Sequence, residues 1–351
     1  MVQFLRKSYL AVIALSTLCS NVLAEDSTSS AVAISPYIVN GSNADVSDYP
    51  SFVSLFQDSS EYNFFYSVAP YCGGTLLNDQ YVLTAAHCIY GNQESQLFTM
   101  AAPQLQNEND YLTAEKQRVV EIYHPANYSN DIGQLLPNDI AILKLESALS
   151  IGTAIAQPRD ESYRSGNHVF TAVGHGNTQS NVDATSVLQK VNLSWVDNSV
   201  CAGEFDNGHY LESFHLCFTG DYSAVSHLLA GSCQGDSGGP IYWDDAGVQT
   251  QVGITSFGPV PCGDNTRNVT AVFTEIADYS DWINDVLNGQ IDPDYVSTDE
   301  ERTAYLISQG FDIRSNESTT SSSSGGGAIS LFALLMLTFF GWKRERHVSA
   351  K

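Results

Sequence analysis

Short segments rich in β-branched and aromatic residues recur along the middle of the chain. Clusters of Gly, Asn, Asp and Pro separate them, as is typical of strands joined by turns. The segments cover residues 52–56, 81–84, 119–123, 140–145, 168–173, 187–196, 252–257 and 269–276. One helix is expected between Tyr279 and Gly289, where apolar residues recur at helical spacing. The sequence therefore predicts an all-β, antiparallel protein with a C-terminal helix.

The N-terminus has the features of an export signal. Arg6 and Lys7 precede an apolar run over residues 9–19, and small residues follow up to Ala24. We therefore expect a signal peptide over residues 1–24, removed together with Cys19. The alternative is an uncleaved anchor helix, but the apolar run is too short to span a bilayer core.

Removal of Cys19 leaves six of the seven cysteines in the exported portion. An even number in an oxidising compartment indicates three disulfides. Six cysteines allow 15 pairings, so the spacing alone does not choose among them. Metal binding is the alternative, although the chain has no paired CxxC or HExxH spacing. The cysteines, in the order in which neighbours would pair, are Cys72 and Cys88, Cys201 and Cys217, and Cys233 and Cys262.

The C-terminus carries a Gly-rich, apolar and then basic tail over residues 325–351. The apolar run over residues 328–342 is short for a bilayer span, and the basic residues after it would stay cytoplasmic. The tail resembles the GlyGly-type C-terminal sorting signal of exported bacterial proteins, which implies removal by a membrane protease of the rhomboid type. A lipid-anchor signal and a buried core helix are the alternatives.

Charge excludes one broad class of function. The chain has 15 Lys plus Arg and 39 Asp plus Glu, a net charge of −24, and no basic face that could bind nucleic acid. Residues 289–324 are acidic and then Ser-rich, without a core-forming pattern, and are expected to be a linker. Apolar residues within 305–311 leave open that this part packs on the protein. So acidic a surface favours solubility and would attract cationic substrates or ions.

Three separated motifs together offer the parts of a nucleophilic site. His87 lies in the sequence TAAHC, Asp139 opens the apolar run NDIAIL, and Ser237 lies in CQGDSGGP. A serine hydroxyl needs a base to take its proton, the base needs a carboxylate to fix its tautomer, and the oxyanion needs backbone donors. Gly235 beside Ser237 suits such a donor site, because a turn that points two N–H groups inward tolerates little side-chain bulk.

On these motifs, and on the chain order His, Asp, Ser, residues 38–288 resemble the chymotrypsin/trypsin (S1-type) serine protease family. The resemblance implies two six-stranded antiparallel β-barrels with the site in the cleft between them, and cysteines paired in chain order. It implies that His87 is the general base, Asp139 the orienting carboxylate and Ser237 the nucleophile. The N–H groups of Gly235 and Ser237 would form the oxyanion hole.

The resemblance also implies a zymogen. Ile38 begins a sequence similar to the family's mature N-terminus, so residues 25–37 would be an activation pro-segment. The ammonium freed at Ile38 would pair with buried Asp236, and the uncut precursor would be nearly inactive because that pair is missing. The residue before the cut is Tyr37, where most relatives carry Arg or Lys. Self-maturation by cleavage after Tyr37 is therefore a hypothesis.

The specificity pocket is expected to accept uncharged side chains. Gly231 stands where trypsin-like relatives place an aspartate, Gly258 keeps one wall open, and Ala271 replaces a second glycine of many relatives. Ser256 lines the pocket and supports Asp139. We therefore expect cleavage after apolar or aromatic residues at P1, the substrate residue before the cut bond. Two departures from the family pattern, His175 and Phe257 where tryptophans are usual, alter packing and subsite shape.

The sequence as a whole thus predicts a secreted or surface-attached serine endopeptidase that acts on proteins or peptides as a monomer. No cofactor and no metal ion are implied, although a calcium site in the acidic loop around Glu108 and Asp110 stays open. The same protease with a basic P1 preference is one alternative. A catalytically silent, protease-like surface binding protein is the other.

Overall fold

The computed structural model describes residues 38–165 and 167–311 of the 351-residue chain. The expected signal peptide, the pro-segment with Tyr37 and the C-terminal tail lie outside the described residues. Within those residues no helix combines the length and the apolar character that a membrane span requires. The apolar run over residues 328–342 also lies outside the described residues.

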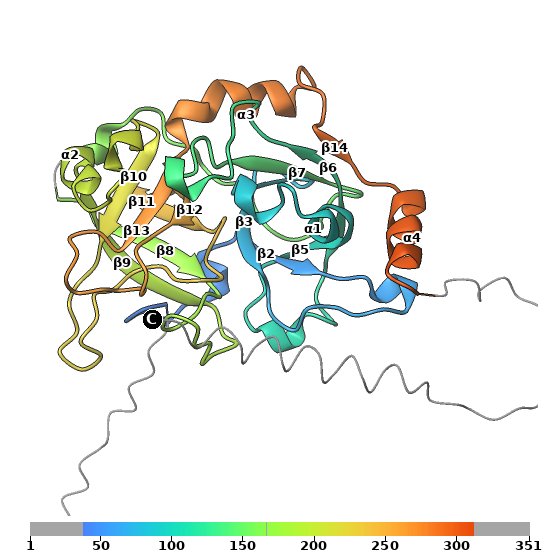
Figure 1. The fold of residues 1–351 in the computed structure, drawn as a ribbon, viewed down its shortest axis with the longest axis horizontal. Helices are drawn as coiled ribbons and strands as arrows, with labels where there is room; N and C mark the ends of the chain where they lie inside the picture. The colour runs from blue at the N-terminus through green and yellow to red at the C-terminus, as the bar shows by residue number, and fades with distance from the viewer. Residues whose placement is uncertain (1–37, 166, 312–351) are drawn as a thin grey trace, which may run out of the picture. The chain divides into compact units, whose positions relative to one another are not determined.

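Two closed antiparallel barrels of six strands each form the fold, as predicted (Figure 1). In the first barrel β6 pairs with both β5 and β7, and in the second β8 pairs with both β9 and β11, which closes each sheet. The first barrel contains β2 (Phe52–Gln57), β3 (Cys72–Leu76), β4 (Tyr81–Thr84), β5 (Thr99–Pro103), β6 (Gln117–Tyr123) and β7 (Ala141–Leu145). The second contains β8 (Phe170–Gly174), β9 (Gln189–Val196), β10 (His215–Thr219), β11 (Pro240–Asp245), β12 (Val248–Phe257) and β13 (Ala271–Glu275).

Each barrel also receives a two-residue edge strand from a distant part of the chain. β1 (Ser42–Asn43) pairs with β9 of the second barrel, and β14 (Tyr295–Val296) pairs with β6 of the first. The segment that begins at Ile38 is thereby attached to the second barrel, and the segment after the C-terminal helix is attached to the first.

Alternating burial explains why the predicted segments form strands. In β9 the side chains of Val191 and Leu193 are buried while Asn192 and Ser194 between them are exposed, which is the two-residue period of a strand with one face on a core. The first barrel encloses a core that includes Val53, Leu83, Val119, Ile142 and Leu143. The second encloses Phe170, Leu193, Phe218, Val252 and Phe273.

Short helices join or flank the barrels. They are α1 (Gln93–Phe98), α2 (Asn198–Ala202), α3 (Ser280–Leu287) and α4 (Asp299–Ser308). α3 confirms the helix predicted between Tyr279 and Gly289, and its buried Ile283 and Val286 join the first core.

The structure corrects the expected linker after residue 288. β14 and α4 fold against the first barrel, and Figure 1 shows α4 beside α1. Thr298 and Glu301 form a capping box that starts α4, and Leu306 packs with Leu97 and Phe98 of α1. This packing could not be predicted from the acidic composition, because α4 buries only one apolar side chain, Leu306, and one arginine, Arg302, against the barrel.

The three disulfides are confirmed in chain order: Cys72–Cys88, Cys201–Cys217 and Cys233–Cys262. Cys72–Cys88 joins β3 to the turn that carries His87. Cys201–Cys217 joins α2 to β10. Cys233–Cys262 ties the loop of Ser237 to the loop between β12 and β13. Three disulfides are typical of a protein that folds in an oxidising, extracytoplasmic compartment.

Candidate active site

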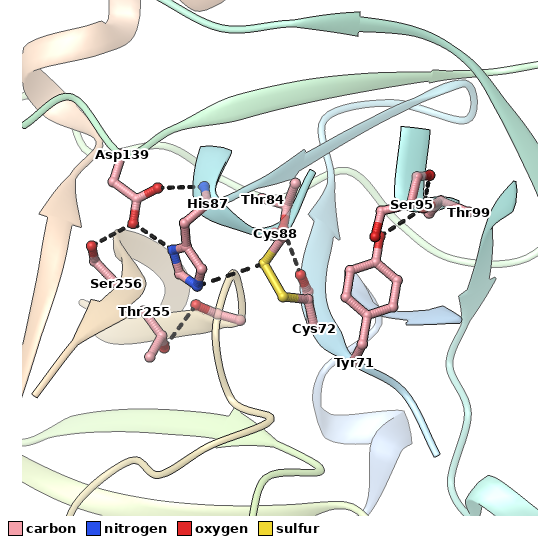
Figure 2. Close-up of a disulfide and its surroundings, with 12 residues drawn as sticks. Tyr71, Cys72, Thr84, His87, Cys88, Ser95, Thr99, Asp139, Thr255 and Ser256 are labelled. Atoms are coloured by element: carbon pink, nitrogen blue, oxygen red, sulfur yellow. Dashed lines mark hydrogen bonds and ion pairs between the residues drawn. A yellow bond between two sulfur atoms is a disulfide. The ribbon is translucent and has the colours of Figure 1, made fainter. Parts of the chain in front are cut away.

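His87 and Asp139 form the centre of the site. His87 lies in the single turn Ala86–Cys88 that ends β4, and its Nδ1 lies 2.7 Å from Oδ2 of Asp139. The backbone N–H of His87 donates to the other carboxylate oxygen, Oδ1, at 2.8 Å. Two bonds to one carboxylate fix both the position and the orientation of the imidazole, as Figure 2 shows beside the Cys72–Cys88 disulfide.

Asp139 precedes β7 of the first barrel but is held by residues of the second. Its side chain is fully buried, and Oδ2 accepts a hydrogen bond from the Ser256 hydroxyl at 2.5 Å (Figure 2). Its backbone carbonyl accepts from the Thr274 hydroxyl at 2.8 Å. Ser256 belongs to β12 and Thr274 to β13, so the orienting carboxylate links the two barrels.

The environment of His87 suits a base. Burial alone would lower the pKa of its imidazole, but the negative charge of Asp139 and the hydrogen bond to it together raise the pKa above the usual value of 6.5. The side chain is still 21% exposed, so one edge of the ring remains accessible. The structure thus gives His87 the accessibility and the raised basicity that proton transfer requires.

Ser237 lies in the loop between β10 and β11, and glycines shape this loop. Gly235 has φ of +101° and Gly238 has φ of +74°, which other residues rarely adopt. A Cβ on Gly238 would lie 2.2 Å from Oγ1 of Thr84, in the strand before His87. The carbonyl of Ser237 accepts from the N–H of Gly73 in β3 at 2.7 Å. These contacts hold the loop against the first barrel next to the turn of His87.

Some N–H groups of this loop, that of Gln234 among them, lack a protein acceptor among the described residues. The N–H groups of Asp236, Gly238 and Gly239 each donate to a backbone carbonyl. Those of Gly235 and Ser237 donate to none of the residues that the structure describes. No hydrogen bond joins the Ser237 hydroxyl to His87 within the same residues. Such bonds are often long until substrate binds, so this geometry does not argue against a catalytic pair.

Asp236 lies beneath the nucleophile loop with its side chain buried. Its carboxylate accepts from the N–H groups of Gly176 at 2.9 Å and Cys233 at 2.8 Å. Burial raises its pKa to about 7, although both hydrogen bonds act in the opposite direction. Ile38 and Val39 are fully buried, and Val39 packs on the Cys233–Cys262 disulfide. The chain is uncut here, so Ile38 carries a peptide nitrogen and not an ammonium.

A pocket of about 120 Å³ opens beside Ser237. Of the four residues that the sequence assigned to it, Ser256 and Gly258 line it, whereas Gly231 and Ala271 do not. Ala271 lies in the core of the second barrel. No charged side chain lines the pocket. The lining residues are Ser232, Cys233, Gln234, Ser237, Thr255, Ser256, Phe257, Gly258, Pro259, Val260 and Cys262.

Thr270 lies close to both Gly231 and Gly258. A Cβ on Gly231 would lie 2.8 Å from Cβ of Thr270, and one on Gly258 would lie 2.9 Å from the Thr270 carbonyl oxygen. Thr270 is buried and its N–H donates to the carbonyl of Phe218. Sequence reasoning missed this residue, because the loop before it has no motif that fixes the alignment.

A second pocket of about 290 Å³ adjoins the first and shares residues 257–260 with it. Leu135 from the first barrel and Phe205 from the second contribute apolar surface, and Glu204, Asp206 and Arg267 contribute charge. The two pockets together could accept several consecutive residues of an extended peptide.

The sequence profile of the Trypsin family matches residues 38–283. The chain belongs to the trypsin family. Chymotrypsin-like elastase family member 1 of Canis lupus familiaris is 30% identical over 253 residues, which cover 71% of this chain and 92% of that protein. Trypsin-1 of Astacus astacus is 29% identical over 251 residues, which cover 70% of this chain and 98% of that one.

Among solved structures, secreted serine protease VesC from Vibrio cholerae superposes on this trypsin-family chain with a TM-score of 0.56 at 25% identity. The match covers 70% of this chain and 48% of VesC, so the chain spans about half the length of that protein. Family membership makes this protein a serine endopeptidase, a hydrolase of peptide bonds. The family match ends within α3, so β14 and α4 of this trypsin-family protein lie beyond it.

Proposed function

We propose that the protein cleaves peptide bonds through an acyl-enzyme formed on Ser237. In this mechanism Ser237 Oγ attacks the substrate carbonyl while His87 Nε2 takes the hydroxyl proton, and His87 then protonates the leaving amine. Water hydrolyses the acyl-enzyme by the same steps with His87 again acting as base. The observation that carries the proposal is the His87 Nδ1–Asp139 Oδ2 contact of 2.7 Å, which leaves Nε2, with only a 4.0 Å contact to Cys88 Sγ, as the ring nitrogen that can take the proton.

The oxyanion that forms in each step would be held by the N–H groups of Gly235 and Ser237. Both lack an acceptor among the described residues, whereas the N–H groups of Asp236, Gly238 and Gly239 donate to backbone carbonyls. Preorganised donors of this kind stabilise developing charge without having to reorient during the reaction. The positive φ of Gly235 supports this role, because it gives the loop the turn that other residues rarely adopt.

The uncharged pocket beside Ser237 supports a preference for apolar or aromatic P1 side chains. A basic P1 side chain would need a buried countercharge, and the residues that line the pocket supply none. The acidic surface of the chain is the argument for the basic alternative, because it would concentrate cationic substrates near the site.

The decisive experiment is hydrolysis of a panel of peptides with Lys, Arg, Tyr, Phe, Leu, Val or Ala at P1. The enzyme carries Ile38 as its confirmed N-terminus, and Ser237→Ala is the blank. We expect cleavage after apolar or aromatic residues that disappears in the blank. Cleavage after Lys or Arg would contradict the assignment of the pocket but keep the protease. No cleavage by correctly cut protein would favour the catalytically silent binding protein.

We also propose that the protein is made as a zymogen and matures by cleavage between Tyr37 and Ile38. The new ammonium of Ile38 would pair with Asp236. The buried positions of Ile38, Val39 and Asp236 support the ion pair. The uncharged pocket supports self-cleavage, because it suits the tyrosine that precedes the cut. Ser237→Ala precursor expressed alone should therefore remain uncut. Its trimming to Ile38 at the wild-type rate would show that another protease performs the cut.

The location of the protein is part of the same proposal. The signal peptide directs export, and the C-terminal tail is removed by a membrane protease or anchors the protein at the surface. The three disulfides support an extracytoplasmic location. The substrates are proteins or peptides, and the enzyme acts as a monomer without a cofactor.

A further inference from the structure

A buried acid and a buried imidazole face each other below the nucleophile loop. Oε1 of Glu108 lies 3.4 Å from Nδ1 of His175. Glu108 is 5% exposed and His175 is 6% exposed. Neither of these two atoms has a hydrogen-bond partner among the described residues. The pair lies where the loops of the two barrels meet, since Glu108 follows β5 and its N–H donates to the carbonyl of Ser186.

The hydrogen bond on the other side of the ring determines what this contact requires. Nε2 of His175 lies 3.1 Å from the carbonyl oxygen of Leu105, which can only accept, so Nε2 carries a proton. In the neutral ring Nδ1 then carries a lone pair and can only accept a hydrogen bond. An ionised carboxylate oxygen facing it would place two acceptors against each other without a proton. One proton must therefore lie between Glu108 and His175.

The turn that carries His175 also holds Asp236. Gly174 and Gly176 flank His175, and a Cβ on either would lie within 2.5 Å of the Asp236 carboxyl group. The N–H of Gly176 donates to Oδ1 of Asp236. Within residues 174–176, His175 has the only side chain, and it extends away from Asp236 toward Glu108 and Phe52. A displacement of the imidazole would therefore displace the N–H that orients Asp236.

We propose that Glu108 and His175 are positioning residues that share one proton, and that this proton keeps the turn 174–176 in place beneath Asp236 and the oxyanion hole. The proposal rests on the proposed function insofar as Asp236 and the loop of Ser237 serve catalysis. It also accounts for the histidine at a position where the family usually has tryptophan, because an indole can only donate, whereas an imidazole can accept from Glu108 and donate to Leu105 at once.

Burial supports the location of the proton on Glu108 at neutral pH. It raises the pKa of Glu108 to about 8, with the nearby charge of Asp183 acting in the same direction, and it lowers the pKa of His175 to about 4. The other titratable group next to the turn is Asp236, whose pKa burial raises to about 7. No Lys or Arg of the described chain forms an ion pair with Glu108 or His175. The inward position of Glu108 also separates it from exposed Asp110, which argues against a calcium site formed by the two.

The sign of the resulting pH dependence follows directly. Because folding raises the pKa of Glu108 from 4.5 to about 8, its contribution to stability is fully present below about pH 4.5 and is lost progressively as pH rises to about 8. Above that pH a buried carboxylate faces the lone pair of His175, and the turn 174–176 loosens. The kcat of the wild type should therefore fall on the alkaline side while KM changes little.

The test compares matured wild type with Glu108→Gln and Glu108→Leu between pH 6 and 10. Glutamine supplies an N–H that does not titrate, so Glu108→Gln should move the alkaline loss of kcat and of thermal stability to higher pH. Glu108→Leu leaves Nδ1 without a donor, and its kcat should fall about tenfold at pH 7, the effect of one lost hydrogen bond. Asp183→Asn is the matched control, because it removes a nearby exposed carboxylate and should lower the wild-type midpoint only slightly.

Two results would overturn the proposal. The first is that Glu108→Gln loses kcat and thermal stability at the same alkaline pH as the wild type. Deprotonation of the Ile38 ammonium, and not of Glu108, would then account for the loss. The other is Glu108→Leu with wild-type kcat at every pH. The unfolding measurement needs no activity, so it tests the shared proton even if the wild type cleaves none of the peptides and the proposed function fails.

Discussion

Replacement of Asp139 by asparagine is expected to lower kcat by about 10⁴-fold, the loss that follows when the histidine of such a triad is held in the wrong tautomer. Oδ2 of Asp139 accepts from His87 Nδ1 and from the Ser256 hydroxyl, and Oδ1 accepts from the backbone N–H of His87. An amide has one acceptor oxygen and one donor nitrogen, so it cannot accept all three bonds. An amide nitrogen at Oδ2 would donate to Nδ1 and leave the proton on Nε2, where it blocks attack by Ser237.

The measurement is kcat at saturating concentration of the best peptide from the P1 panel. Asp281→Asn, which changes an exposed carboxylate on α3, is the matched control and should retain wild-type kcat. Thermal unfolding separates loss of catalysis from loss of folding, since Asp139 is buried. A decrease of less than about tenfold in a folded Asp139→Asn variant would show that His87 does not depend on this carboxylate.

The sequence predicted much of this site because the site is built from local motifs. His87, Asp139 and Ser237 each lie in a stretch whose residue types follow from the chemistry required there. Gly235 was singled out for the same reason, since an inward-facing turn needs a residue without a side chain, and its role in the oxyanion hole stays a prediction. Thr270 was not predictable, because its role comes from contact with Gly231 across the barrel and not from any pattern in its own segment.

The strands show the same division between local and non-local information. All eight strands expected from β-branched and aromatic runs are present in the structure. The barrel strands β3, β5, β10 and β11 and the two-residue edge strands β1 and β14 were missed. β3 and β5 contain the sequences CGGTL and TMAAP, which are poor in such residues. β3 forms between β2 and β4 because its glycines allow close approach: a Cβ on Gly73 would lie 3.0 Å from Gly239 of the nucleophile loop. That requirement arises only when the two barrels are assembled.

The buried pair of Glu108 and His175 illustrates a third limit. A glutamate in an acidic loop is normally solvated, and nothing in its own segment indicates that it points inward. Its burial follows from the pairing of residues 106–108 with residues 186–188 of the other barrel. The sequence indicated only that His175 stands where the family usually has tryptophan. It gave no indication that Glu108 is the partner of His175.

Replacement of Arg302 by leucine is expected to lower the free energy of unfolding by about 3 kcal/mol, because it leaves several buried acceptors without a donor. Arg302 is 2% exposed. Its guanidinium donates to the carbonyls of Leu97 at 2.7 Å and Val119 at 3.3 Å, and to the Ser297 hydroxyl at 2.6 Å. Leu97 is near the end of α1, whose last carbonyls have no partner inside the helix, so Arg302 also caps α1.

Thermal unfolding with the disulfides intact should show this loss as a decrease in Tm of roughly 6–12 °C for a protein of this size. Arg267→Leu is the matched control, since the side chain of Arg267 is 43% exposed and its contacts, a 3.9 Å ion pair with Asp264 and a hydrogen bond to the carbonyl of Glu204, lie at the surface. Its effect should be about 0–1 kcal/mol. If the two substitutions lowered Tm equally, the contacts of Arg302 in α4 would contribute no more to the free energy of unfolding than those of an exposed arginine.

The larger expected loss of stability on replacing Arg302 also indicates that the segment after residue 288 belongs to the folded domain. Arg302 binds α1 and β6 of the first barrel, so a chain ended at residue 288 loses the donor to Leu97 and the edge strand β14 together. Such a truncation should therefore destabilise the barrel that carries His87 and Asp139, and by at least as much as Arg302→Leu does. The domain that supports catalysis accordingly includes α4 (Asp299–Ser308), beyond the end of the trypsin-family match at residue 283.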